Sequence, residues 1–228
     1  MLKKTTYTQL IILIDPDKYN QDLIKIANSC KVSYIFVGGS SLQKNNFNST
    51  IKSIRSLTKI PIIIFPGDET QVSNLADGIL ILSLLSGRNA EYLIGKHVKA
   101  AKKIKASKLV AIPTGYILVN GEKKSTTQKI TKTKPLDSKK EIIETAIAGE
   151  LLGKQLIYLE AGSGAKKTLK TSVIKDVKKH ISIPLIIGGG INSTEKAKSI
   201  LASKPDYMVI GNILEKNPNL LIDINTLF

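Results

Sequence analysis

Short apolar runs alternate with longer segments of mixed polarity along the whole chain. Continuous apolar runs of this length are typical of strands that are buried on both faces of a parallel sheet. The segments between them carry apolar residues at helical spacing, as at Ile51, Ile54 and Leu57. The expected strands are residues 10–14, 34–37, 62–65, 79–82, 109–113, 156–160, 185–187 and 207–210. Eight such units predict an α/β fold, a (β/α)8 barrel or TIM barrel in which residues 1–228 form one domain; a doubly wound open sheet is the alternative.

Two connections depart from this regular alternation. Residues 68–77 have room for only a couple of helical turns, so the third helix unit is predicted to be abbreviated. Residues 114–137 are polar and rich in Lys and Thr, which predicts a mobile loop or a small hairpin near the functional face. Ser138 and Glu141 then match a helix capping box. Regular helices are expected at about residues 22–29, 90–104, 138–152, 172–180 and 193–201, with a last helix that closes near residue 227.

The sixth predicted strand runs directly into a carboxylate and several glycines. Because successive side chains of a strand alternate between its faces, Tyr158 and Glu160 are expected to point the same way. The glycines that follow leave backbone N–H groups uncovered, as a phosphate-binding loop requires, although an ordinary strand-to-helix turn has the same pattern. Residues 188–190 (Gly-Gly-Gly) and 211–212 (Gly-Asn) follow the seventh and eighth strands, where barrels commonly bind phosphate. The sequence therefore favours the barrel and predicts a phosphate site at its carboxyl-terminal face.

The formal net charge of +16 changes this picture only slightly. Lysines occur along every predicted helix, and Asn, Ile and Lys are abundant together, which favours a compositional bias over a dedicated polyanion site. The charge still predicts attraction of anionic substrates and lipid headgroups. Aromatic residues make up 5% of the chain and form no recognisable stacking platform, so nucleic acid is not an expected partner.

Other features of the composition limit the location of the protein. The apolar runs are too short to span a bilayer, and we expect neither a transmembrane segment nor a secretory signal. The single cysteine, Cys30, cannot form an internal disulfide and agrees with a cytoplasmic protein. His97 and His180 fall in predicted helices away from the glycine-rich loops, and we expect both to be structural.

Five motifs in a fixed order resemble those of a known family. They are Leu13-Ile14-Asp15-Pro16-Asp17-Lys18, Val37-Gly38-Gly39-Ser40, Leu85-Ser86-Gly87-Arg88-Asn89, Tyr158 through Gly164, and Ile187-Gly188-Gly189-Gly190-Ile191. Together they resemble the geranylgeranylglyceryl phosphate synthase family, which includes the bacterial heptaprenylglyceryl phosphate synthases, over essentially the whole chain. The resemblance implies a barrel prenyltransferase that joins the 3-hydroxyl of sn-glycerol 1-phosphate to a polyprenyl diphosphate and so forms the first ether bond of an ether lipid. It also implies a requirement for Mg²⁺, a homo-oligomer (a dimer or larger), and peripheral contact with a membrane through the lipid product.

The resemblance assigns roles to particular residues. Asp15 and Ser40 match the metal-binding positions, and Glu160 is the hypothetical general base, with a purely positioning role as the alternative. Asp17 is a second metal candidate or a turn-capping residue, and Lys18 is either a phosphate contact or solvated. The residues expected to hold glycerol phosphate are Tyr158, Leu159, Glu160, Ala161, Gly162, Ser163, Gly164, Gly189, Gly190, Gly211 and Asn212.

The prenyl chain requires an apolar groove that leads away from the metal. Tyr116, Ile117 and the pair Leu84-Leu85 are candidates for its walls, although apolar residues at such positions also suit the core. Leu13 stands where the heptaprenyl relatives carry a lysine, which favours the archaeal-like branch and a geranylgeranyl donor.

Two other classes of function remain open from the sequence. A sugar-phosphate isomerase or aldolase would also be a phosphate-binding barrel, and would need a paired acid and base or a Schiff-base lysine, for which Lys18 is the only candidate. A basic protein that binds nucleic acid or anionic membrane without turnover is the non-enzymatic alternative, and it leaves the glycine loops unexplained.

Overall fold

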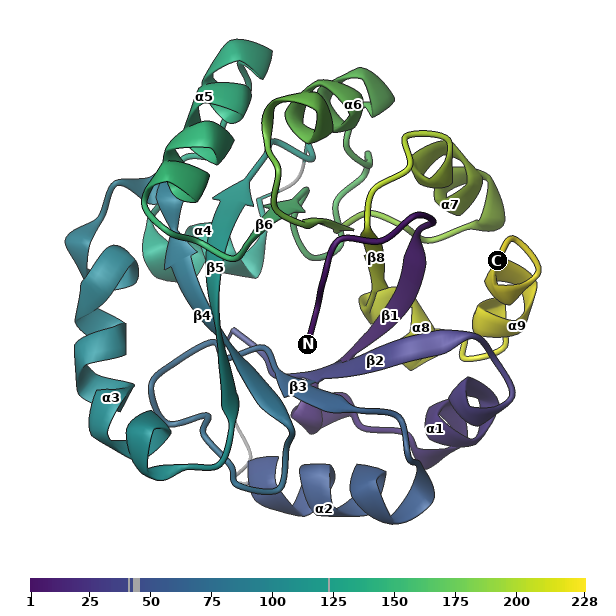
Figure 1. The fold of residues 1–228 in the computed structure, drawn as a ribbon. Helices are drawn as coiled ribbons and strands as arrows, with labels where there is room; N and C mark the ends of the chain where they lie inside the picture. The colour runs from purple at the N-terminus through teal and green to yellow at the C-terminus, as the bar shows by residue number, and fades with distance from the viewer. Residues whose placement is uncertain (41, 43–45, 123) are drawn as a thin grey trace.

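Eight parallel strands close into a barrel in the computed structural model, which describes residues 1–40, 42, 46–122 and 124–228 (Figure 1). The strands follow one another around the barrel in chain order, and β1 pairs with β8 in the register Ile12 opposite Ile210. This closure confirms the predicted barrel and excludes the open sheet. The strands are β1 Gln9–Ile14, β2 Val32–Val37, β3 Ile62–Ile64, β4 Gly78–Leu84, β5 Val110–Leu118, β6 Leu156–Glu160, β7 Leu185–Gly188 and β8 Tyr207–Ile210.

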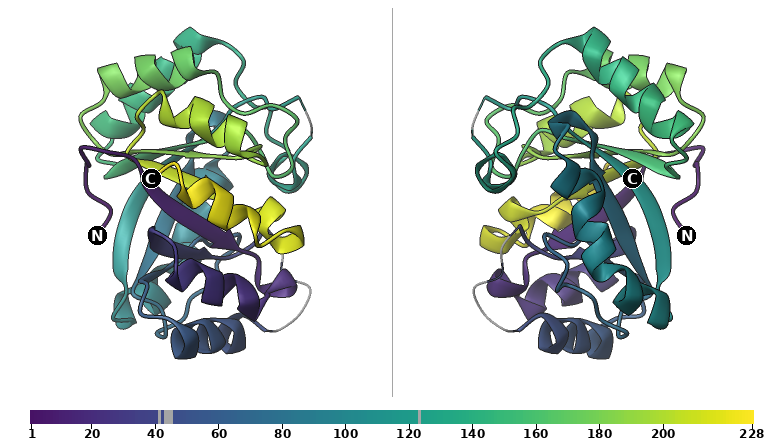
Figure 2. Two further views of the ribbon diagram at one scale, coloured as in Figure 1. Left: turned by 90° about the vertical axis from the view of Figure 1, so that its right-hand side faces the viewer. Right: turned by 90° about the vertical axis from the view of Figure 1, so that its left-hand side faces the viewer.

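Helices surround the barrel, and the loops that follow the strands gather at one end of it (Figure 2). The N-terminal segment lies at the opposite end, where Leu2 is buried against the barrel interior. The helices are η1 Pro16–Lys18, α1 Gln21–Asn28, α2 Phe47–Leu57, η2 Leu85–Gly87, η3 Glu91–Gly95 (a π-helix), α3 Lys96–Ala106, α4 Thr126–Thr131, α5 Lys139–Leu151, α6 Thr171–His180, α7 Thr194–Leu201, α8 Asn212–Lys216 and α9 Leu220–Asn225.

Alternation along the strands produces two apolar layers. The side chains of Ile157 and Leu159 pack outward between the strands and the helices, whereas Leu156 and Tyr158 fill the barrel interior. Because both faces of most strand segments are buried, the strands read as continuous apolar runs rather than as alternating ones. At the end of β6 the same alternation turns Glu160 to the side of Tyr158, as predicted from the sequence.

The connection between β3 and β4 contains turns only, and all of its residues are described. The prediction of an abbreviated unit is confirmed, and residues 68–77 form no helix. Polar side chains hold this segment in another conformation: the carboxylate of Asp68 accepts the backbone N–H of Thr70 at 2.7 Å. Gln71 donates to the carbonyl of Gly39 at 2.8 Å and so ties the connection to the loop after β2. Asx turns of this kind compete with helix formation.

Residues 114–118, expected to be loop, continue β5 and pair with β6, with Tyr116 opposite Tyr158. Pro113 does not end the strand, because its carbonyl still accepts the N–H of Gln155. Within the polar segment that follows, Ser125 and Gln128 form a complete capping box at the start of α4. Ser138 caps α5 by accepting the N–H of Glu141 at 3.4 Å. The single predicted final helix is instead two short helices, α8 and α9. None of the helices in the described ranges is long and apolar enough to cross a membrane.

Candidate active site

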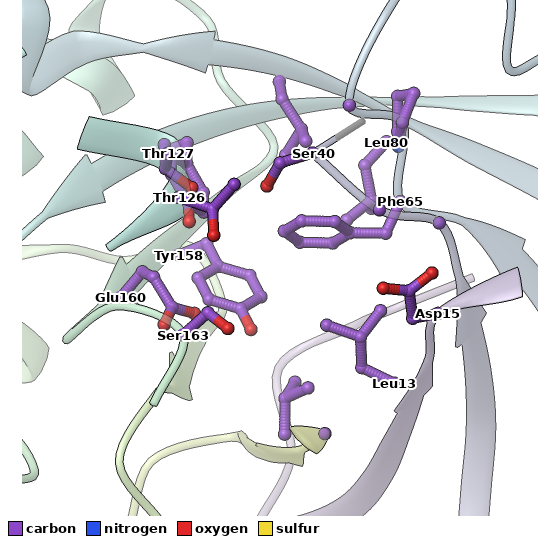
Figure 3. A pocket seen from close by; sticks show the side chains of 18 of the residues that line it. Leu13, Asp15, Ser40, Phe65, Leu80, Thr126, Thr127, Tyr158, Glu160 and Ser163 are labelled. Carbon is purple, nitrogen blue, oxygen red and sulfur yellow. The ribbon is translucent and has the colours of Figure 1, made fainter. Parts of the chain in front are cut away.

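A cavity of about 800 Å³ opens at the carboxyl ends of the strands. Figure 3 shows Asp15 on one side of it, Glu160 and Ser163 on the other, and the ring of Phe65 between them. Most of the site residues predicted from the sequence line this cavity, although they are spread over almost the whole chain. The predicted residues on its wall are Asp15, Ser40, Tyr158, Glu160, Ser163, Gly164, Gly189, Gly190, Gly211 and Asn212.

Three predicted residues, all of them described, do not line the cavity. Leu159 and Ala161 are buried in the layer between the strands and the helices. The backbone N–H of Gly162 is used within the protein, because it donates to Oε1 of Glu160 at 2.7 Å. These three residues therefore shape the loop, and the neighbouring side chains face the cavity.

Glu160 is held at the end of β6 with its carboxylate almost entirely buried. Loss of solvation raises the pKa of Glu160 to about 7, against the opposing effects of the Gly162 N–H and of the neighbouring Tyr158 hydroxyl. Gly189 passes so close that a Cβ there would overlap Oε1 of Glu160, and its φ of +85° suits glycine. A carboxyl group with such a pKa can exchange a proton near neutral pH, as a general base must.

Tyr158 lies beside Glu160 inside the barrel mouth and is fully buried. Its Oη forms no hydrogen bond of good geometry with any described residue, although the carboxylate of Glu160 is close. Burial first, and the charge of Glu160 second, raise the pKa of the Tyr158 phenol well above its usual value. A neutral, buried hydroxyl that lacks a protein partner is suited to bind a polar group of a ligand, because leaving it unpaired costs about 1–3 kcal/mol.

Two glycine loops form the wall beside this acid and phenol. Gly189 and Gly190 both line the cavity and adopt positive φ angles, +85° and +71°, a backbone conformation that suits glycine. The side chain of Ser163 donates to Oδ1 of Asn212 at 3.0 Å and joins the loop after β6 to the start of α8. Glycine loops at the ends of barrel strands can bind an anion through their backbone N–H groups, without a basic side chain.

Asp15 and Ser40 follow the adjacent strands β1 and β2 and present oxygen atoms to the same cavity. Asp15 caps η1 by accepting the N–H of Asp17 at 3.0 Å. A Cβ on Gly39 would lie 3.2 Å from Oδ1 of Asp15, which shows how closely the loop after β2 approaches this carboxylate. The described residues contain no cluster of three metal-binding side chains. Mg²⁺ commonly uses one or two carboxylates and completes its coordination with water and substrate phosphate, so this donor set fits it.

A large apolar part of the cavity wall includes both faces of β4. Leu80, Leu82 and Leu84 come from the inner face, and Ile79 and Ile81 from the outer face. The cavity reaches both faces because no helix follows β3, which opens space beside α3. Of the residues predicted to line a prenyl groove, Tyr116 and Leu84 line this cavity, whereas Ile117 and Leu85 belong to the outer core.

Several wall residues were not predicted from the sequence. Phe65, Thr126 and Thr127 line the cavity, and the capping box at Ser125 was the available signal for the two threonines. The expectation that His97 lies away from this face was wrong: it is on the cavity wall, and its Nε2 is 3.0 Å from the carbonyl of Leu82. Burial lowers the pKa of His97. His180 is exposed at the end of α6 and does not line the cavity.

The glycine-rich loops after β7 and β8 and the oxygen donors after β1 and β2 line one cavity at the carboxyl ends of a (β/α)8 barrel, an arrangement that suits a phosphorylated ligand. Comparison with known proteins identifies its family: residues 3–226 match the PcrB family, and the chain belongs to it. A geranylgeranylglyceryl phosphate synthase of Chitinophaga pinensis is 43% identical over 92% of this chain and 86% of its own length. A protein of the same name from Pyrococcus horikoshii is 36% identical over 92% and 84%.

A solved structure gives the same result for the fold. The crystal structure of (S)-3-O-geranylgeranylglyceryl phosphate synthase from Thermoplasma acidophilum, in complex with its substrate sn-glycerol-1-phosphate, superposes with a TM-score of 0.90 at 32% identity. The match covers 97% of this chain and 93% of that one. The family resemblance noted in the sequence motifs is therefore confirmed.

Proposed function

We propose that the protein is a prenyltransferase that joins the 3-hydroxyl of sn-glycerol 1-phosphate to a polyprenyl diphosphate, releasing diphosphate and forming a prenylglyceryl phosphate ether. The observation that carries this proposal is a single cavity with two chemically different halves. One half has a buried carboxylate beside glycine loops, and the other is a long apolar wall around β4. Such a site suits a small phosphorylated alcohol and an isoprenoid chain at the same time.

Glycerol phosphate occupies the half formed by β6, β7 and β8 in this proposal. The backbone N–H groups near Gly189, Gly190 and Asn212 bind its phosphate, and the hydroxyls of glycerol reach Glu160 and Tyr158. Glu160 accepts the proton of the 3-hydroxyl as that oxygen attacks the allylic carbon. The pKa of about 7 leaves a substantial fraction of Glu160 ionised and ready to accept this proton at neutral pH.

The prenyl diphosphate occupies the other half. Asp15 and Ser40 would hold Mg²⁺, which supplies charge neutralisation to the departing diphosphate. The apolar side chains of β4, α3 and Tyr116 surround the isoprenoid chain and keep water from the allylic carbon. Leu13 also lines the cavity, and we retain the prediction of a geranylgeranyl donor from this position.

We further propose a cytoplasmic homo-oligomer. The lone cysteine, Cys30, is free, which suits a reducing compartment. Leu151 and Leu152 are 82% and 73% exposed at the end of α5, and such adjacent apolar side chains suit burial against a second copy.

The alternative function, a sugar-phosphate isomerase or aldolase, has little support, because its Schiff-base lysine candidate is Lys18. Burial acts to lower the pKa of Lys18, but the hydrogen bond and charge of Glu215, together with Asp15, outweigh it and raise the pKa. A Schiff-base lysine requires the opposite shift.

The test is an assay of the purified protein with Mg²⁺, labelled sn-glycerol 1-phosphate and prenyl diphosphates of graded length, in which organic-extractable label is followed. We expect product with one preferred length, no product with sn-glycerol 3-phosphate, and loss of product when the metal is chelated. Folded protein that binds sn-glycerol 1-phosphate yet forms no product with any donor would overturn the proposal.

A further inference from the structure

The outer side of η3 and α3 exposes large apolar side chains to solvent. Ile94 is 57% exposed and Val98 is 67% exposed, and the two residues lie one helical turn apart. Ala101, Lys102 and Lys105 continue the same side of the helix and are also exposed. We call Ile94, Val98, Lys102 and Lys105 the α3 stripe.

The opposite side of the same helix forms part of the cavity wall. His97, Ala100 and Ile104 line the apolar half of the cavity, and Tyr92 of η3 lines it as well. A single helix thus has the apolar cavity on one side and the exposed stripe on the other. In Figure 1 it lies at the outer edge of the barrel beside β4 and β5.

The charge of this helix is strongly positive. The segment Lys96–Ala106 contains no carboxylate, and its lysines are Lys96, Lys99, Lys102, Lys103 and Lys105. Two of them are neutralised, since Lys96 pairs with Glu69 at 2.5 Å and Lys99 pairs with Glu91 at 2.6 Å. Lys103 donates to the carbonyl of Thr70. Lys102 and Lys105, which follow the exposed apolar residues along the helix, form no ion pair with any described residue.

We propose that the α3 stripe docks the protein on an anionic lipid bilayer. Ile94 and Val98 enter the interface between headgroups and acyl chains, while Lys102 and Lys105 lie at the level of the anionic headgroups. Exposed apolar side chains next to unpaired lysines are features of helices that lie in a membrane interface. The proposal rests on the proposed function in one respect: a long-chain prenyl donor resides in a bilayer, and docking at α3 brings its chain next to the apolar half of the cavity.

Binding of the purified full-length protein to vesicles tests this proposal directly. The probes are vesicles of phosphatidylglycerol with phosphatidylcholine, and vesicles of phosphatidylcholine alone, compared by co-sedimentation at low and at high salt. We expect binding to the anionic vesicles only, and weaker binding at high salt, because salt screens the attraction.

A charge-reversal pair provides the decisive comparison. Lys102→Glu with Lys105→Glu should weaken binding to anionic vesicles by at least about tenfold, because each lysine near an anionic surface contributes substantially to binding. Lys175→Glu with Lys179→Glu is the matched control, since these residues are exposed on α6 and the change in net charge is the same. Equal losses in both pairs would show that binding reflects only the overall charge and would overturn the proposal. Absence of vesicle binding by the unaltered protein would overturn it too.

The apolar part of the stripe is tested by Ile94→Ser with Val98→Ser. Weaker vesicle binding with an unchanged oligomeric state supports docking on a bilayer. A change of oligomeric state in size-exclusion chromatography would show that a second copy of the chain covers the stripe, and this outcome contradicts the proposal.

Activity with a short, water-soluble prenyl diphosphate separates this proposal from the proposed function. The stripe variants should retain full turnover with the soluble donor and lose turnover only with a long-chain donor supplied in anionic vesicles. Lack of turnover with soluble donors by the unaltered protein would contradict the proposed function, whereas vesicle binding would still be measured independently.

Discussion

The ammonium of Lys18 lies 3.1 Å from the carboxylate of Glu215 and 3.5 Å from that of Asp15. This lysine links the turn after β1 to α8, and so joins the proposed metal side of the cavity to the side that binds glycerol phosphate. All three residues line the cavity. Lys18 is therefore neither a Schiff-base candidate nor simply solvated; it separates two carboxylates that would otherwise repel each other and an incoming diphosphate.

Lys18→Met should lower kcat/KM for the prenyl diphosphate by roughly tenfold, because the substitution leaves two carboxylates facing an anionic substrate. Lys18→Arg keeps the charge and should retain most of the activity. Lys25→Met on α1 is the control, since the pair that Lys25 forms with Asp22 is exposed and neither residue lines the cavity. Steady-state kinetics distinguish the three variants. Equal kcat/KM values for Lys18→Met and Lys25→Met would show that the ion pairs of Lys18 do not support binding of the prenyl diphosphate.

Glu160→Gln should reduce turnover by about 10²- to 10⁴-fold while binding of sn-glycerol 1-phosphate persists, because the amide keeps the acceptor for the Gly162 N–H but cannot take up a proton. Calorimetric binding and single-turnover rates measure the two effects separately. Near-normal turnover would leave Glu160 with a positioning role only. For the unaltered enzyme, kcat/KM should fall as the pH drops through about 7, since the base is then protonated.

The same carboxyl group should make stability depend on pH. Folding raises the pKa of Glu160 from the ordinary value of 4.5 to about 7, so the folded protein binds the proton more tightly than the unfolded chain. The resulting stabilisation of the fold is complete below about pH 4.5 and is lost as the pH rises through 7. Glu160→Gln removes this loss. The variant should therefore be more stable than the unaltered protein at pH 8, by up to about 3 kcal/mol, and gain little at pH 5. Denaturant unfolding at the two pH values measures the difference, and an equal effect at both would contradict it.

Gly189→Ala should destabilise the fold by at least about 3 kcal/mol and abolish glycerol phosphate binding, because its Cβ would overlap Oε1 of Glu160 and lie 2.7 Å from the Gly162 nitrogen. Gly153→Ala is the matched control. Gly153 also has a positive φ, +78°, but a Cβ added there would meet no atom within 4 Å, so only backbone strain of about 1–2 kcal/mol should result. Equal unfolding free energies for the two variants would show that a Cβ at residue 189 does not clash with Glu160.

Ala100→Phe should shift donor preference toward shorter prenyl diphosphates, because Ala100 is a small residue of α3 on the apolar wall of the cavity and is almost fully buried. Ala101→Phe on the exposed side of the same helix should leave the preference unchanged. Product lengths from a mixture of donors provide the measurement. An unaltered length distribution in Ala100→Phe would exclude this wall from the path of the isoprenoid chain.

Much of this architecture could be predicted from local pattern. The apolar runs indicated the strands, and alternation along residues 158–160 placed Tyr158 and Glu160 on one face, since both signals depend only on the geometry of a few consecutive residues. The glycine loops after β7 and β8 could be assigned to one end of the barrel because topology brings all carboxyl ends together.

The sequence by itself determined the fold, the family and many of the residues of the polar half of the cavity. Only the tertiary structure decided that the β3–β4 connection contains no helix, that both faces of β4 and His97 therefore reach the cavity, and that Lys18 meets Glu215. These features depend on distances between residues far apart in the chain. The raised pKa of Glu160 likewise arises from the burial that the assembled barrel imposes, and no local sequence pattern encodes that burial.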